Sequence, residues 1–176
     1  MDEDLRFVKY RKSDIAVVRK LQESFMREAA FGLLFRTGQA MGSRIARNAR
    51  PYKQQYFEAV RRILVDEGWV KDIQFQNDTI TATGSIESEK GTKNTCHMLR
   101  GIIAKVYEGY FGKLMTCSEA ECEGTGKPHC VFKVSFTGNG NGRREPGNGT
   151  EGDQESPRRG GLGQSGTVLR GRDERQ

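Results

Sequence analysis

Four cysteines lie close together in the sequence, at positions 96, 117, 122 and 130. In a reducing compartment, cysteines clustered in this way indicate metal binding more than disulfides. Cys122 and Cys130 frame the segment ECEGTGKPHC, which we expect to be a loop between two strands, so that both sulfurs meet there. Cys96 falls at the expected start of a helix, where the helix dipole favours a thiolate. Together, these three residues form a candidate zinc site.

The fourth ligand of such a site is not fixed by spacing. A closed zinc site takes four ligands in a tetrahedron, drawn from thiolate, imidazole and carboxylate groups. The candidates near the three cysteines are Cys117, Glu119, Glu121, His97 and His129. Zinc chemistry alone favours Cys117, and because Cys117 and Glu119 lie two residues apart on one strand face, only one needs to reach the metal. The alternative interpretation is that the cysteines are small buried hydrophobic residues.

Hydrophobic periodicity predicts the elements that position these side chains. A helical pattern begins near Ser13 and continues to Pro51, with a break or kink expected near Gly32 or Gly38. The remaining expected elements are a helix over 54–67 capped by Gly68, strands over 69–76 and 79–88 joined by an Asn77-Asp78 turn, a helix over 96–111, and strands over 113–120 and 130–136.

This order of elements predicts the fold class. The order is helix, helix, strand pair, helix, strand pair. It indicates an α+β fold, in which helices cover an antiparallel sheet on one face. The zinc site would lie at the strand-loop-strand element that contains Cys122 and Cys130. The segment LRFVKY near the N-terminus could add an edge strand.

Composition divides the 176 residues into a folded part and a tail. Residues 138–176 contain 11 of the 22 glycines, and their only large apolar residues are Leu162, Val168 and Leu169. Such a segment buries too little surface to offset its ordering entropy. We therefore predict one domain over 1–137 and a disordered Gly/Arg-rich tail over 138–176.

The charge and hydropathy exclude some functions and disfavour others. The net charge of +6 is mildly basic, and the basic runs RKSDIAVVRK and SRIARNARPYK are typical of solvated helix faces, so a nucleic-acid partner is disfavoured. No stretch reaches the roughly 20 apolar residues of a membrane span, and the N-terminal segment lacks the apolar core of a signal peptide. We expect a cytoplasmic protein.

The segment CHMLRGIIAKVYEGYFGKLMTCSEAECEGTGKPHCVF resembles a known family pattern. The pattern is Cys, Gly five residues later, Glu-x-x-Cys, a Gly, and Cys-x-Phe; it falls here on Cys96, Gly101, Glu119, Cys122, Gly126, Cys130 and Phe132. It is similar to the 4-vinyl reductase domain family, which also forms the hydrocarbon-sensing part of bacterial transcription activators. The resemblance extends from about residue 31 to 136.

The resemblance implies a ligand set and a binding function. Members with this pattern bind zinc through three Cys and one Glu, which implies Cys96, Glu119, Cys122 and Cys130 here. Relatives form a mostly apolar cavity and tend to dimerise, so a homodimer is expected, and the Gly-bearing helix LLFRTGQAMG suits close helix contact. Two residues depart from the family: Lys105 replaces a common Gly, and Lys127 replaces a common acidic residue.

Aromatic residues at core spacing are candidates to line such a cavity, although most residues of this kind only fill cores. The candidates are Phe31, Phe35, Phe57, Trp69, Phe75 and Tyr107. No catalytic residue is predicted, because a zinc closed by four protein ligands leaves no position for water and no Gly-x-Gly-x-x-Gly element could hold a nicotinamide cofactor.

The sequence therefore favours a non-catalytic sensor domain for a small hydrophobic or aromatic molecule, stabilised by structural zinc, with a regulatory protein as a further partner. The alternatives are an enzyme or accessory factor in tetrapyrrole vinyl reduction and a zinc-stabilised nucleic-acid-binding protein.

Overall fold

The computed structural model describes residues 10–137. The predicted tail and the predicted N-terminal edge strand lie outside the described residues. The elements, in chain order, are α1 (Lys12–Met26), α2 (Ala29–Ala49), the 3₁₀ helix η1 (Arg50–Gln55), α3 (Tyr56–Asp66), β1 (Asp72–Gln76), β2 (Thr79–Thr83), α4 (His97–Phe111), β3 (Met115–Glu121), the 3₁₀ helix η2 (Glu123–Thr125) and β4 (Cys130–Phe136).

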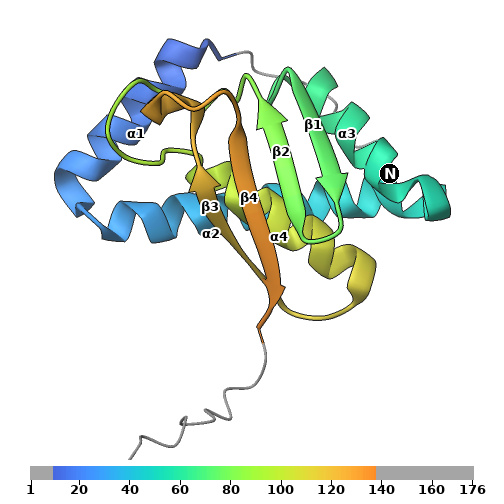
Figure 1. Ribbon diagram of the computed structural model, residues 1–176. Coiled ribbons are helices and arrows are strands. Elements are labelled where there is room, and N and C mark those ends of the chain that lie inside the picture. Colours follow the sequence, from blue (N-terminus) through green and yellow to red (C-terminus); the bar gives the residue numbers. More distant parts are fainter. Residues whose placement is uncertain (1–9, 138–176) are drawn as a thin grey trace, which may run out of the picture. The chain divides into compact units, whose positions relative to one another are not determined.

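The four strands form one antiparallel sheet in the order β1-β2-β4-β3. Figure 1 shows α2 and α4 behind one face of this sheet, with α3 near the β1 edge. Large side chains between the two layers are fully buried: Ile73, Ile80 and Phe132 from the sheet, and Leu99, Ile102, Ile103 and Val106 from α4. The predicted α+β class, with helices on an antiparallel sheet, is confirmed.

The expected break in the first helical segment lies elsewhere than predicted. α1 ends at Met26 and α2 begins at Ala29, and Arg27 between them has a φ of 50°. The predicted break is therefore present, but it precedes Gly32, and both Gly32 and Gly38 lie inside α2. Gly38 lets α2 pack closely against α4 and does not bend the helix, because a Cβ there would lie 2.0 Å from the backbone oxygen of Met98 in α4.

Glycines hold α2 and α4 in backbone contact at more than one point. A Cβ at Gly101 of α4 would lie 2.0 Å from the carbonyl oxygen of Phe35, and one at Gly42 would lie 2.8 Å from that of Ile102. The glycine-bearing face of α2 is therefore used within the chain. It is not free for the helix contact with a second copy that the sequence suggested.

The turns between elements follow the sequence signals closely. Gly68 after α3 has a φ of 77°, and Asn77 in the β1–β2 turn has a φ of 50°. The second predicted strand is shorter than expected, since β2 ends at Thr83 and residues 84–96 form a loop instead. This loop buries Ser85 and Glu87 against the start of α4.

α1 carries most of its large apolar side chains outward. Arg19 is its buried residue, whereas Val17, Val18, Leu21 and Phe25 are exposed, with 81% of Phe25 accessible. Contacts to the loop hold the helix: Lys12 Nζ donates to the carbonyl of Ser85 at 3.0 Å, and both Arg19 and Lys20 pair with Glu89. Among the described helices, none is long and apolar enough to cross a membrane.

Candidate metal centre

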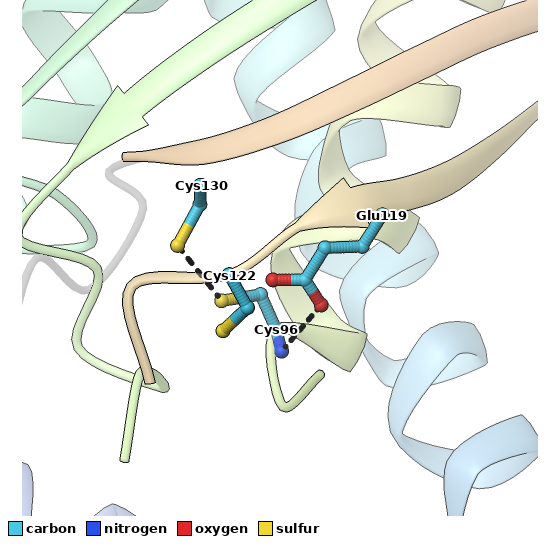
Figure 2. Close-up of side chains that lie close together, drawn as sticks. All are labelled: Cys96, Glu119, Cys122 and Cys130. Carbon is cyan, nitrogen blue, oxygen red and sulfur yellow. Dashed lines mark hydrogen bonds between the residues drawn. The ribbon is translucent and has the colours of Figure 1, made fainter. Parts of the chain in front are cut away.

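One end of the sheet brings together four buried side chains that can bind a metal ion. Figure 2 shows the side chains of Cys96, Glu119, Cys122 and Cys130 gathered together. Their ligand atoms all lie within 4.8 Å of one another. The sulfurs of Cys96 and Cys130 are 3.7 Å apart. These are the four residues that the family resemblance implied.

Three separate elements supply the cluster. Cys96 directly precedes α4, Cys130 opens β4, and Cys122 follows the last residue of β3. Glu119 lies on the inward face of β3, where the pairing with β4 shifts register between Glu119 and Glu121. An irregularity of this kind bends the strand and re-aims its side chains, which suits a site at a strand end.

The Glu119 carboxylate is oriented as a ligand would need to be. Its Oε2 accepts a hydrogen bond from the backbone N–H of Cys96 at 3.1 Å. Its Oε1 is buried and has no hydrogen-bond partner among residues 10–137. A buried carboxylate oxygen without a partner is costly, and a metal ion would remove that cost. Three sulfurs and this oxygen make a donor set that fits a tetrahedral ion such as zinc.

The thiols are placed too close together for all of them to ionise without a cation. Hydrogen bonds from Cys130 and Cys96 lower the pKa of Cys122. Hydrogen bonds to Cys122 and Cys130 raise the pKa of Cys96. The pKa of Cys130 is raised to about 12, chiefly by its hydrogen bond to Cys122. Burial raises the pKa of Glu119 to about 8. A divalent cation would compensate the charge of all four ligands.

Neighbouring polar groups contact the sulfurs of the cluster. The backbone N–H of Glu123 donates to Cys130 Sγ at 3.4 Å, and the Thr95 hydroxyl lies 3.7 Å from Cys122 Sγ. Close packing also fixes the loop that follows β3, since a Cβ at Gly124 would lie 2.1 Å from the Glu89 carbonyl oxygen. Such neighbours orient metal ligands and tune their basicity.

The other candidates for the fourth ligand lie outside the cluster. Cys117 is buried in the hydrophobic core, where burial raises its pKa to about 12. The His97 ring stacks on Phe31 at a centroid distance of 4.4 Å, and His129 contacts the Thr83 hydroxyl at 3.2 Å. Glu121 lies 3.8 Å from Lys127. The geometry thus groups Glu119, and not Cys117, with the three cysteines.

Sequence reasoning missed Glu87, a buried carboxylate beside the cluster. Its two oxygens accept hydrogen bonds from the backbone N–H groups of Met98 and Leu99, at 2.9 and 2.7 Å. It therefore caps α4, while Cys96 at the N-cap position makes no side-chain capping bond. The sequence gives little indication of this role. Glu87 lies ten residues before the helix in a polar stretch, and a cap that arrives from a distant loop has no fixed spacing from the helix start.

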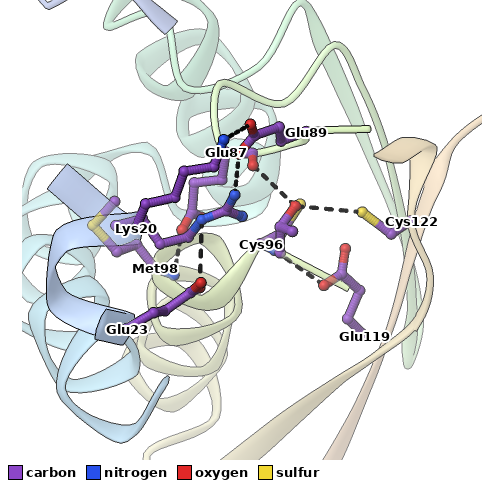
Figure 3. A network of polar contacts seen from close by, with 10 residues as sticks. Lys20, Glu23, Glu87, Glu89, Cys96, Met98, Glu119 and Cys122 are labelled. Carbon is purple, nitrogen blue, oxygen red and sulfur yellow. Dashed lines mark hydrogen bonds and ion pairs between the residues drawn. The ribbon is translucent and has the colours of Figure 1, made fainter. Parts of the chain in front are cut away.

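Figure 3 shows a chain of polar contacts that runs from α1 to the cluster. Arg19 contacts Glu23 and Glu89 on one side. On the other side, the Thr95 hydroxyl donates to the Glu87 carbonyl at 2.9 Å and lies next to Cys122. Burial raises the pKa of the Glu87 carboxyl to about 7, although its two backbone donors and the nearby Arg19 and Arg100 act in the opposite direction.

The six aromatic residues predicted to line a cavity fall into separate groups. Phe57, Phe75 and Tyr107 form a contact cluster between α3, β1 and α4, with ring centroids 5.0 to 6.2 Å apart. Phe31 and Phe35 lie near the start of α4, against His97 and Arg100. Trp69 follows α3, and its Nε1 donates to Glu67 at 3.3 Å.

The architecture and the cluster define a small α+β domain with a candidate metal centre of three thiolates and one carboxylate. Residues 82–136 match the family model of the 4-vinyl reductase domain, so the resemblance seen in the sequence is confirmed. A search among curated proteins found no significant match.

Two solved structures share the fold. The phenol-responsive sensory domain of the transcription activator PoxR, solved with phenol, aligns with a TM-score of 0.63 and 20% identity over 74% of this chain and 76% of that one. A vinyl-4-reductase family protein from Methanocaldococcus jannaschii aligns with a TM-score of 0.51 and 17% identity over 75% of this chain and 98% of that one.

Proposed function

We propose that this chain is a non-catalytic sensor domain that binds a small hydrophobic or aromatic molecule and is stabilised by a structural zinc ion. The observation that carries the proposal is the combination of a match to the 4-vinyl reductase domain with the fold of a phenol-responsive sensory domain. The cluster of three cysteines and one glutamate supports the structural role of the metal.

Zinc is the metal that suits these donors best. Thiolates are soft ligands, and three of them with one carboxylate favour a tetrahedral d¹⁰ ion over hard cations such as magnesium or calcium. With four protein ligands the ion would have no open position, so its contribution would be to hold β3, β4 and the start of α4 together. Cys96, Glu119, Cys122 and Cys130 are the proposed ligands.

The aromatic cluster of Phe57, Phe75 and Tyr107 is the proposed ligand site. These rings lie between helix and sheet, and Phe57 and Phe75 are only partly buried. The hydroxyl of Tyr107 donates to the carbonyl of Asn77 at 2.8 Å, which places a polar group at the edge of an apolar surface. A small aromatic molecule would bind by rearranging these rings, with Phe31, Phe35 and Trp69 as further candidates.

A homodimer is part of the proposal, and α1 offers the surface for it. Val17, Leu21 and Phe25 are exposed at intervals of four residues on this helix. Val17 and Phe25 lie equally far from Leu21, so a two-fold axis through Leu21 would set a small side chain of one copy against a large one of the other. Phe25→Ser should therefore shift the protein to monomer in light-scattering measurements, with the exposed Tyr52→Ser as control.

Native mass spectrometry tests the proposal, because it reports metal, bound molecule and subunit number together. We expect one zinc per chain and a saturable complex with small aromatic probes such as phenol and alkylphenols. Phe57→Ala should weaken that complex, and Tyr52→Ala, at an exposed ring, should leave it unchanged. Failure of every aromatic probe to saturate the zinc-loaded protein would contradict the sensor function.

A further inference from the structure

A groove lies between the end of α2 and the end of α4, and none of its lining residues belongs to the cluster or to the proposed aromatic site. It has a volume of about 430 Å³. Its lining includes the small residues Ala46, Gly109 and Gly112 and four basic side chains: Arg47, Arg50, Lys105 and Lys113. Ser43 and Leu114 complete the lining together with Glu108. This volume lies within the range of small-molecule sites.

The single carboxylate of the groove is already engaged. Glu108 pairs with Lys105 through a Nζ–Oε2 distance of 2.5 Å, and its Oε1 accepts the backbone N–H of Met115 at 3.3 Å. Within residues 10–137, Arg47, Arg50 and Lys113 make no ion pair with a carboxylate. The groove therefore has an excess of positive charge and donors that no carboxylate engages.

These charges come from two elements that are distant in the sequence. Arg47 and Arg50 belong to the run SRIARNARPYK, which by itself is typical of a solvated helix face. The fold places that run opposite Lys105 and Lys113, because the glycine contacts bring α2 against α4. At Gly109, which lines the groove, a Cβ would lie 2.8 Å from the Ala46 Cβ. Close helix packing thus brings basic side chains of both helices to the lining of one groove.

We propose that this groove binds a phosphate-bearing small molecule. Two guanidinium groups can each bind a phosphate bidentately, and a lysine ammonium adds a third charged donor. A phosphate ester carries close to two negative charges and several acceptor oxygens, which match three such cations better than a single carboxylate does. The exposed Leu114 side chain offers an apolar contact to the organic part of the ligand.

The test uses the full-length, zinc-loaded chain and pyrophosphate as the soluble probe, by isothermal titration calorimetry. We expect one saturable site whose affinity falls as salt is raised. The double variant R47Q/K113Q should weaken it by at least about tenfold, since it removes two charged donors from the groove. R36Q/K93Q, which removes the same charge from exposed positions outside the groove, should change the affinity by less than about twofold.

A second arm separates a free phosphate ester from a lipid headgroup. Vesicles of phosphatidylcholine with phosphatidylglycerol are added to the same proteins, with pyrophosphate as competitor. Soluble pyrophosphate binding without vesicle binding assigns the groove to a free phosphate ester; vesicle binding that R47Q/K113Q abolishes and R36Q/K93Q retains assigns it to a headgroup. Equal weakening in both double variants, no saturation, or binding only to a polynucleotide would overturn the proposal.

Discussion

At its first turn, α4 is surrounded by buried polar groups, whereas its last turn is open to solvent. At this closed end, the Cys96 thiol donates to the Ser85 hydroxyl, and the Glu87 carboxylate accepts from two backbone N–H groups of the helix. At the open end, Tyr110 and Phe111 are half exposed and Lys113 has no carboxylate partner within the described residues. One helix therefore joins a rigid, pre-arranged centre to an accessible groove.

This difference shows how the two ends use charge. At the closed end, potential anions converge without a matching cation, so the geometry favours a metal ion that completes it. At the open end, cations converge around one engaged carboxylate, so the geometry favours an anion from solution. Binding at either end would stabilise the fold by mass action, and a structural zinc ion, whose ligand site does not exist in the unfolded chain, should give the larger effect.

The largest effect should come from breaking the closed end. Cys122→Ser or Cys130→Ser should remove the zinc and lower the free energy of unfolding by several kcal/mol, because a structural metal contributes directly to folding. Thermal unfolding with and without a chelator, alongside metal analysis, measures this. A metal-free protein that melts at the same temperature as the zinc-loaded protein would contradict the structural role.

Much of the closed end could be predicted from the sequence, because its ligands obey local rules. Cys122 and Cys130 flank a loop between strands, and Cys96 marks the start of a helix. The family pattern then favoured Glu119 over Cys117, where thiolate chemistry alone pointed the other way. Glu87 could not be found in this manner, since its role depends on a loop returning to the helix start.

The open end could not be predicted, because it exists only where two helices meet. The run containing Arg47 and Arg50 has an amphipathic pattern, and nothing in it indicates Lys105 or Lys113 as neighbours. The role of the glycines in α2 could not be predicted from the sequence either. They suggested a kink or a dimer contact, but their function is to let α4 approach, which depends on tertiary contacts.

The second prediction separates Glu119 from Cys117 within β3. Glu119→Ala should strongly weaken zinc binding, because it removes the oxygen ligand, whereas Cys117→Ser should cost about 1 kcal/mol of stability as a core change. Zinc-competition titration of both variants measures the difference. X-ray absorption provides an independent check, with three sulfurs at about 2.3 Å and one oxygen at about 2.0 to 2.2 Å. Four sulfurs would reverse the assignment.

The third prediction compares glycines along the helix pair. Gly101→Ala, towards the closed end, would place a methyl 2.0 Å from a backbone oxygen of α2 and should cost about 3 kcal/mol. Gly109→Ala, at the groove, would place a methyl 2.8 Å from the Ala46 Cβ, a milder overlap than the one at Gly101, and should cost about 1 kcal/mol. Gly32→Ala, with nothing within 4 Å, should stabilise by up to about 1 kcal/mol. Equal losses in denaturant unfolding at Gly101 and Gly109 would remove the distinction between the two ends.

The smallest effect concerns Glu87 and the pH dependence of stability. Glu87→Gln keeps the size of the side chain but replaces one acceptor with an amide N–H₂ that faces a backbone donor, so it should cost about 1 kcal/mol near pH 5. Burial raises the pKa of the Glu87 carboxyl from 4.5 to about 7 in the folded chain. Its protonated form is therefore favoured by folding, and that contribution is fully present below pH 4.5 and lost as the pH rises through about 7.

The stability of the native chain minus that of the Glu87→Gln variant should consequently fall from pH 5 to pH 8 and change sign, because only the native chain loses this contribution and the loss exceeds the initial difference. Both proteins retain the same metal ligands, so any pH dependence of zinc binding is common to them and cancels in the difference. Urea unfolding at several pH values, with zinc in excess, gives this difference directly. A difference that rises with pH would mean that Met98, Leu99 and the nearby arginines hold Glu87 ionised, and that α4 is capped by a charge instead of a neutral acid.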